Sequence, residues 1–177
     1  MTTPTPLMPR ERVPALDLPL VGGGRYVLGA KPAARFDLLV FYRGLHCPVC
    51  AKYLMELERL APEFEKRGVR SVAISADGSE RAAKMAEKVK ASLVSFAFDL
   101  PLSTARAWGL YLSAGRGEEP ALFNEPGVFL VRPDATLYYG ATQTMPFARP
   151  PFADLLGAVD YAIAKDYPAR GEYAGEA

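Results

Sequence analysis

The chain has 177 residues, 50% of them hydrophobic, and its 21 basic and 20 acidic residues leave a net charge of +1 at neutral pH. This length can bury one substantial core and is short for two. Basic and acidic residues are interspersed, which disfavours nucleic acid and anionic membranes as partners. No apolar stretch approaches the ~20 residues of a membrane span, and residues 1–14 are polar and proline-rich, without a signal-peptide core. We therefore expect a cytoplasmic protein with no nucleic-acid or membrane partner.

The first predicted elements are a flexible arm over residues 1–14 and a β-hairpin. Two short segments, 15–20 and 25–28, flank a turn that contains three consecutive glycines, a pattern typical of two paired strands. These glycines lack the Gly-Lys-Ser/Thr of a phosphate-binding loop. Residues 36–42 then form a largely apolar run without Pro or Gly. This run predicts a central strand that is covered on both faces.

An amphipathic helix is predicted after this strand. Apolar residues recur every three or four positions with charged residues between them, and the helix is expected to end near Gly68. The apolar positions are Cys50, Leu54, Leu57, Ala61 and Phe64. Pro48 suits the first helical position, because its ring fixes φ and its missing N–H is not needed there. Cys47 is then predicted to be the capping residue.

The rest of the chain alternates strands and helices. We predict a strand at 69–75, a helix at 80–90 capped by Ser79, a short strand at 96–99 and a helix at 103–108. The Gly-, Glu- and Pro-rich residues 113–125 are either a substrate-facing insertion or a solvated connection. A hairpin at 127–131 and 136–139 and a helix at 152–165 come next, before a frayed tail at 167–177. This order predicts one α/β domain over residues 15–166, with a central mixed sheet flanked by helices.

Cys47 and Cys50 are the two cysteines of the chain and form a Cys-Pro-Val-Cys motif. A Cys-x-x-Cys between a strand and a helix lets one thiolate attack and its neighbour resolve, so it indicates redox chemistry. At the start of a helix, unpaired N–H groups and the helix dipole favour a Cys47 thiolate. Cys50 lies one turn further along the apolar stripe and is expected to be more buried. We predict that Cys47 is the nucleophile and Cys50 the resolving thiol.

Two structural interpretations of this pair are weaker. Zinc needs about four ligands, and the only other soft donor, His46, is adjacent to Cys47 and hard to aim at the same ion. No metal or other cofactor is therefore predicted. A purely structural disulfide across so short a loop would constrain little of the unfolded chain. His46 is either a proton donor or electrostatic aid to the thiolate, or a surface residue beside the motif.

The motif and its surroundings resemble a known family. The strand, the Cys-Pro-Val-Cys helix, the second inner strand and the late hairpin introduced by Pro126 are similar to the thioredoxin fold, and the N-terminal β-hairpin extension is similar to peroxiredoxins. The run Phe-Tyr-Arg-Gly at 41–44, followed by the motif at 47–50, resembles the peroxiredoxin-like branch of the alkyl hydroperoxide reductase and thiol-specific antioxidant family. The resemblance extends from about Val13 to Lys165.

The resemblance also bears on Arg43 and Pro126. Peroxidatic sites of that family have the pattern Pro-x-x-x-Thr/Ser-x-x-Cys, and with Cys50 at the peroxidatic position Arg43 replaces the Pro and Cys47 the Thr. With Cys47 at that position instead, Val40 and Gly44 stand there, which fits no better. The family also has an Arg just before the late hairpin strand, where this chain has Pro126. Thioredoxins carry a cis-proline there, so Pro126 is predicted to be cis and to clamp the substrate; the alternative is an ordinary trans turn proline.

Proton transfer needs a group other than the buried Asp of thioredoxins, because Phe41 stands at that position. The candidates are His46, a water molecule, or Arg43 if its guanidinium contacts the thiolate. Alternatively, Arg43 pairs with an acidic neighbour at the end of the sheet.

Three functions stay open from the sequence. The first is an antioxidant-type thiol–disulfide oxidoreductase, which acts on a disulfide-containing protein or a small thiol substrate and is reset by an upstream thiol reductase. The second is a thiol-dependent peroxidase that reduces hydroperoxides. The third is a non-catalytic redox-sensing or partner-binding domain. Its partner surface would lie near the late hairpin, at Tyr138, Tyr139, Met145, Pro146 and Phe147, residues for which ordinary packing is the alternative. The resemblance to peroxiredoxins also implies a homodimer.

Overall fold

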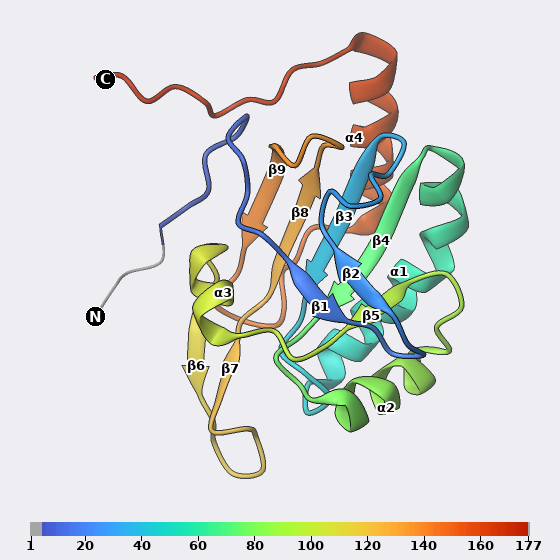
Figure 1. The fold of residues 1–177 in the computed structure, drawn as a ribbon, viewed down its shortest axis with the longest axis vertical. Coiled ribbons are helices and arrows are strands. Elements are labelled where there is room, and N and C mark those ends of the chain that lie inside the picture. Colours follow the sequence, from blue (N-terminus) through green and yellow to red (C-terminus); the bar gives the residue numbers. More distant parts are fainter. Residues whose placement is uncertain (1–4, 177) are drawn as a thin grey trace.

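The computed structural model describes residues 5–176 and contains a central five-stranded sheet in the order β5-β4-β3-β8-β9 (Figure 1). Its strands are β3 (Phe36–Phe41), β4 (Val69–Ile74), β5 (Ser95–Ala97), β8 (Gly127–Val131) and β9 (Leu137–Thr142). The central strand β3 is parallel to β4 and antiparallel to β8. All six of its residues are buried, because both faces of the sheet are covered. The predicted mixed sheet is confirmed.

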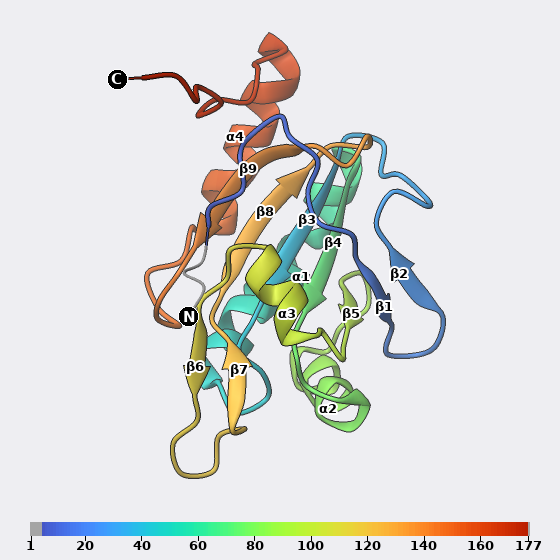
Figure 2. The ribbon, with the colours of Figure 1, turned by 60° about the vertical axis from the view of Figure 1, so that its left-hand side comes forward.

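Helices cover one face of this sheet. Side chains alternate between the faces of a strand, so Leu38 and Val40 of β3 pack in one cluster and Leu39 and Phe41 in another. The first cluster joins the sheet to α1 (Pro48–Lys66), α2 (Ser79–Val89) and α4 (Phe152–Lys165). The second joins it to α3 (Leu102–Ala107) and to the hairpin of β1 (Asp17–Pro19) and β2 (Arg25–Val27), which lie on the other face in Figure 2. The predicted α/β architecture with an N-terminal hairpin is therefore confirmed.

Helix boundaries follow local chemistry closely. Helix α1 begins at Pro48 with Cys47 as its N-cap, as predicted, and ends at Lys66, two residues before Gly68, which has a φ of 73°. The predicted cap of α2 is wrong by one residue. Gly78 is the N-cap and Ser79 is the first helical residue, and no side chain caps this end.

The segment expected to be a loop at 113–125 is a β-hairpin for much of its length. Strands β6 (Leu112–Ala114) and β7 (Leu122–Asn124) pair antiparallel and project beyond the end of the main sheet (Figure 2). Each strand has three residues, too few for a clear alternation of apolar and polar positions. The hairpin was missed because its stability comes from contacts with the rest of the molecule.

Both terminal segments are tied to the sheet. Residues 1–4 of the predicted arm and residue 177 of the tail lie outside the described residues. From Arg10 onward the arm is not loose, because the backbone N–H groups of Arg10 and Val13 donate to carbonyls of Leu137 and Ala135. In the tail, the carbonyl of Ala169 accepts a hydrogen bond from Arg10, 3.0 Å away. These contacts are between distant segments, which explains why composition alone predicted disorder. Within residues 5–176, no helix is both long and apolar enough to cross a membrane.

We predict that Leu39→Ala destabilises the fold by roughly 2–5 kcal/mol, because it removes a fully buried side chain and leaves a cavity in the central strand. Leu122→Ala is the matched control: this leucine is 54% exposed, so its truncation should change stability by less than about 0.5 kcal/mol. Urea unfolding followed by circular dichroism measures both. Similar losses in the two variants would contradict the packing assigned to β3.

Candidate active site

The two cysteines lie at the start of α1 and form a disulfide, with their Cα atoms 5.2 Å apart. Cys47 is the N-cap, and its Sγ accepts a hydrogen bond from the backbone N–H of Cys50 at 3.1 Å. Cys50 is completely buried and Cys47 is 2% exposed. The predicted order of burial is thus present, although the difference is small. A Cys47 thiolate at this position faces both an N–H donor and the positive end of a 19-residue helix.

Asp77 fixes the loop that leads to Cys47. This carboxylate is almost fully buried and accepts hydrogen bonds from the backbone N–H of Leu45 at 2.7 Å and from Nε of Arg81 at 2.8 Å. Gly44 packs against the same carboxylate with a φ of 135°, and a Cβ atom there would lie 2.8 Å from Asp77 Oδ2. Glycine is required at this position for backbone conformation and for space.

Arg43 lies between two carboxylates of the β6–β7 region. Its Nη2 is 3.4 Å from Glu119 and its Nε is 3.3 Å from Glu125, while its guanidinium covers the Phe123 ring at 4.6 Å. Of the two expectations for Arg43, pairing with acidic neighbours is the one observed. Glu125 is itself 3% exposed and also accepts a hydrogen bond from the hydroxyl of Ser113.

His46 is half-buried and packs against Phe123, with 4.6 Å between ring centroids. Its Nδ1 is 3.5 Å from Arg81, and its Nε2 is buried without a hydrogen-bond partner among the described residues. Burial, together with the nearby charge of Arg43, lowers the pKa of His46 below its ordinary value of 6.5. The imidazole is therefore largely neutral at neutral pH.

Pro126 is buried and immediately precedes Gly127, which pairs with Phe41 at the end of β3. The prediction of a cis peptide bond is wrong, because all peptide bonds among the described residues are trans. The Pro126 carbonyl accepts a hydrogen bond from the N–H of Gln143, and this bond continues the β8–β9 pairing beyond Gly127. A substrate clamp inferred from a cis bond loses its basis here.

Several supporting residues were not predicted from the sequence. They are Asp77, Arg81, Phe123, Asn124, Glu125 and Arg149. Asn124 donates from its side chain to the carbonyl of Tyr42 at 3.1 Å and so ties the β6–β7 hairpin to the end of β3. The available signal was an acidic residue in the loop after an inner strand, as in the case of Asp77, because such residues gather at the same edge of a parallel sheet as the motif.

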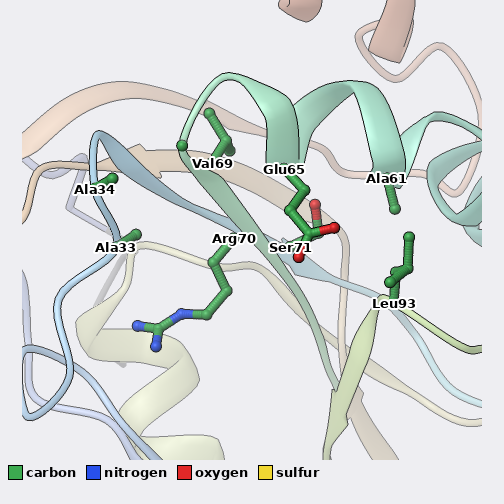
Figure 3. A pocket seen from close by; sticks show the side chains of 9 residues that line it. Ala33, Ala34, Ala61, Glu65, Val69, Arg70, Ser71 and Leu93 are labelled. Carbon is green, nitrogen blue, oxygen red and sulfur yellow. The ribbon is translucent and has the colours of Figure 1, made fainter.

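The described residues hold no metal site, and their best-defined cavity lies away from the cysteines. Within residues 5–176, no group of three or more His, Cys, Asp and Glu side chains could hold a metal ion. A cavity of about 240 Å³ lies at the other end of the sheet, between the start of β4 and the end of α1 (Figure 3). There Glu65 and Ser71 lie on the α1 side of β4, and Arg70 extends the opposite way to its partner Asp37 at 2.6 Å. This cavity is separate from the cysteine pair.

A mixed sheet, a helix that starts at a Cys-x-x-Cys and an added N-terminal hairpin define a thioredoxin-like redox protein. The sequence pattern of the AhpC/TSA family matches residues 9–139, and the chain belongs to this family. Among curated proteins, no sequence matches the chain.

Several solved structures that share this fold are described as peroxiredoxins or peroxiredoxin-like proteins. A mutant of peroxiredoxin 6 from Arenicola marina has a TM-score of 0.79 at 18% identity, over 96% of this chain and 81% of its own. Peroxidoxin BcpB from Mycobacterium tuberculosis has a TM-score of 0.72 at 23% identity, over 89% and 98%. A peroxiredoxin-like protein from Aquifex aeolicus has a TM-score of 0.72 at 17% identity, over 89% and 88%. At these identities the likeness is one of fold.

We predict that Gly44→Ala destabilises the protein more than Gly23→Ala. Both glycines have positive φ, 135° and 106°, but a Cβ at Gly23 meets nothing within 4 Å. Gly23→Ala therefore carries backbone strain alone, roughly 1–3 kcal/mol. Gly44→Ala adds overlap with the Asp77 carboxylate. Urea unfolding and the rate of Cys47 alkylation measure the effect, and equal losses in the two variants would count against the role of Asp77.

We further predict a pH effect from His46. Since its pKa is lowered in the folded protein, the unfolded chain binds the proton more readily, and the free energy of unfolding falls as pH drops below about 6.5. His46→Gln removes this contribution. Urea unfolding between about pH 7.5 and pH 5 should show a shallower decline for the variant than for the wild type. Parallel declines would show that His46 titrates in the same way in both states.

Proposed function

We propose that this protein is a thiol–disulfide oxidoreductase with Cys47 as nucleophile and Cys50 as resolving thiol. The observation that carries the proposal is the Cys47 cap on α1, where Sγ accepts the Cys50 N–H. A donor and a helix dipole at this sulfur stabilise the thiolate, which is the reactive form. Membership of a thiol-dependent antioxidant family supports the same chemistry.

The reaction proceeds in two exchanges. The Cys47 thiolate attacks one sulfur of a substrate disulfide; a mixed disulfide forms, the substrate S–S bond breaks, and the leaving thiolate takes up a proton. Cys50 loses its proton and attacks the Cys47 sulfur, which releases the second substrate thiolate. The protein dithiol is oxidised by two electrons to the disulfide, and the substrate is reduced to two thiols. A dithiol reductase of lower potential returns the protein to its reduced form.

A thiol peroxidase is the second candidate, and AhpC/TSA membership is the observation that favours it. One of the two thiolates attacks a hydroperoxide, the O–O bond breaks, and a sulfenic acid and an alcohol or water result. The other thiol condenses with the sulfenic acid and releases water, which again gives the Cys47–Cys50 disulfide. Arg43 and Cys47, at the positions of the Pro and Thr of family peroxidatic sites, favour exchange over rapid peroxide turnover.

The proposed substrates are a disulfide-containing protein or a small disulfide, with a hydroperoxide for the second function. Pro48 serves by starting the helix directly behind Cys47, and Arg43 and His46 are proposed as supporting residues near the thiolate. Cytoplasmic location and a homodimer are part of the proposal. Low net charge supports the expectation that neither nucleic acid nor a membrane is a partner.

The first test traps the exchange intermediate. The reduced Cys50→Ser variant is mixed with an aromatic disulfide that releases a coloured nitrothiobenzoate. It should retain one nitrothiobenzoate on Cys47, visible by mass spectrometry, because the resolving thiol is gone. The wild type should release both halves and retain none. Cys47→Ser should react at least about tenfold more slowly, since Cys50 lacks the cap position.

Hydrogen peroxide provides the competing arm of this experiment. Its reaction with the reduced protein is followed by stopped-flow fluorescence of Trp108, the only tryptophan. Slow oxidation by peroxide beside brisk disulfide exchange supports the oxidoreductase. Rapid, saturating oxidation by peroxide that one cysteine variant abolishes, together with slow exchange, would overturn it in favour of the peroxidase.

A further inference from the structure

A shallow groove of about 390 Å³ includes Val49 of the Cys-Pro-Val-Cys motif in its lining. One wall is the first two turns of α1, with Val49 and Tyr53, and the other is the segment that precedes α4, with Phe147 and Arg149. Val49 stands between the two cysteines in the chain, so the groove begins at the motif itself. The Tyr53 hydroxyl donates to the carbonyl of Pro150 at 2.5 Å, which holds the two walls together.

Arg149 is an uncompensated cation in this groove. Its guanidinium lies 4.2 Å from the centre of the Tyr53 ring, and both terminal nitrogens are buried without a hydrogen-bond partner among the described residues. Burial lowers the pKa of Arg149 to about 10, so the group is still charged at neutral pH. A buried charge without a partner is costly, and a bound anion would offset that cost.

The other charges near the groove do not neutralise Arg149. Glu56 is engaged by Arg59 through two hydrogen bonds, of 2.9 and 2.6 Å. Lys52, which also lines the groove, adds a further positive charge. Arg43 has its own carboxylates, Glu119 and Glu125. The groove is therefore complementary to an anion.

Its walls also expose apolar surface. Val49 is 40% exposed and Phe147 is 56% exposed. Exposed side chains of this size next to a reactive residue favour contact with an apolar part of a ligand. The ligand indicated by these features has a short apolar chain and one negatively charged end.

We propose that the groove binds the substrate of Cys47 and that this substrate is a disulfide with a carboxylate at the end of a short alkyl chain. The carboxylate pairs with Arg149, a geometry that guanidinium groups favour, and the alkyl chain lies against Val49 and Phe147. The disulfide is then held along the first turn of α1. This inference rests on the proposed exchange function and names its substrate class; Arg149 is a binding residue and neither gains nor loses a proton.

Three small disulfides of similar length test the proposal: dithiodipropionate is anionic, hydroxyethyl disulfide is neutral and cystamine is cationic. The second-order rate constant for oxidation of the reduced protein is measured with each disulfide. It is divided by the rate constant for reaction of the same disulfide with a small neutral thiol, which corrects for the intrinsic reactivity of each disulfide. The wild type should prefer the anionic over the neutral disulfide by roughly tenfold, equivalent to 1.4 kcal/mol. High salt should reduce this preference.

Variants locate the preference. In Arg149→Gln the ratio of anionic to neutral rates should fall to about one, and Arg149→Lys should retain part of it. Arg132→Gln is the matched control, because Arg132 also covers a tyrosine ring, that of Tyr138 at 4.8 Å, and does not line the groove. It should keep the wild-type ratio.

Two results separate the ways in which the proposal can fail. If the wild type exchanges briskly with the neutral disulfide and shows no preference for the anionic one, the groove assignment is wrong while the exchange function stands. This comparison needs no variant, so a folding defect in Arg149→Gln does not affect it. If none of the three disulfides reacts faster with the reduced protein than with the small neutral thiol, the exchange function fails and the substrate assignment fails with it.

Discussion

The buried carboxylate of Asp77 joins the loops that follow β3 and β4, and the position of the cysteine pair depends on it. It accepts the backbone N–H of Leu45, two residues before Cys47, and the guanidinium of Arg81. The parallel pairing of β3 with β4 brings these loops to the same edge of the sheet. The Asp77 carboxylate leaves no room for a side chain at residue 44. The glycine backbone therefore packs directly against this carboxylate in the loop that leads to the helix cap. The thiol chemistry begins from that cap.

Two arginines near the site differ in whether a carboxylate balances their charge. Arg43 is paired with Glu119 and Glu125, so its positive charge is largely neutralised. Arg149 has no such carboxylate among the described residues. We assign stabilisation of the Cys47 thiolate to the helix N-terminus and binding of the substrate carboxylate to Arg149. A division of this kind lets substrate charge be selected without altering the reactivity of the sulfur.

Sequence patterns predicted features that local chemistry determines. The start of α1 follows from Pro48 and the buried strand β3 from its apolar run, and both are as expected. The β6–β7 hairpin was missed because its three-residue strands pair within a Gly- and Glu-rich segment and are held by contacts such as Asn124 to Tyr42.

The site was only partly predictable for the same reason. The cysteine pair and its cap are local, but Asp77 contacts Leu45, 32 residues away, and Tyr53 contacts Pro150, 97 residues away. No single-sequence pattern links such positions. The trans bond of Pro126 corrects an expectation taken from thioredoxins, since the isomer is set by the surrounding packing and not by the proline alone.

The N-terminal segment has a consequence for assembly. Strand β9 is an edge of the sheet, and exposed edges can pair with strands of other chains. Here Leu137 exchanges backbone hydrogen bonds with the segment at Arg10 and Glu11, and Arg12 bridges to Thr136. The first part of the edge is thus already capped by the protein's own chain. A dimer that extends the sheet through this part of β9 would first have to displace the N-terminal segment. The segment therefore disfavours edge-to-edge pairing with strands of other chains.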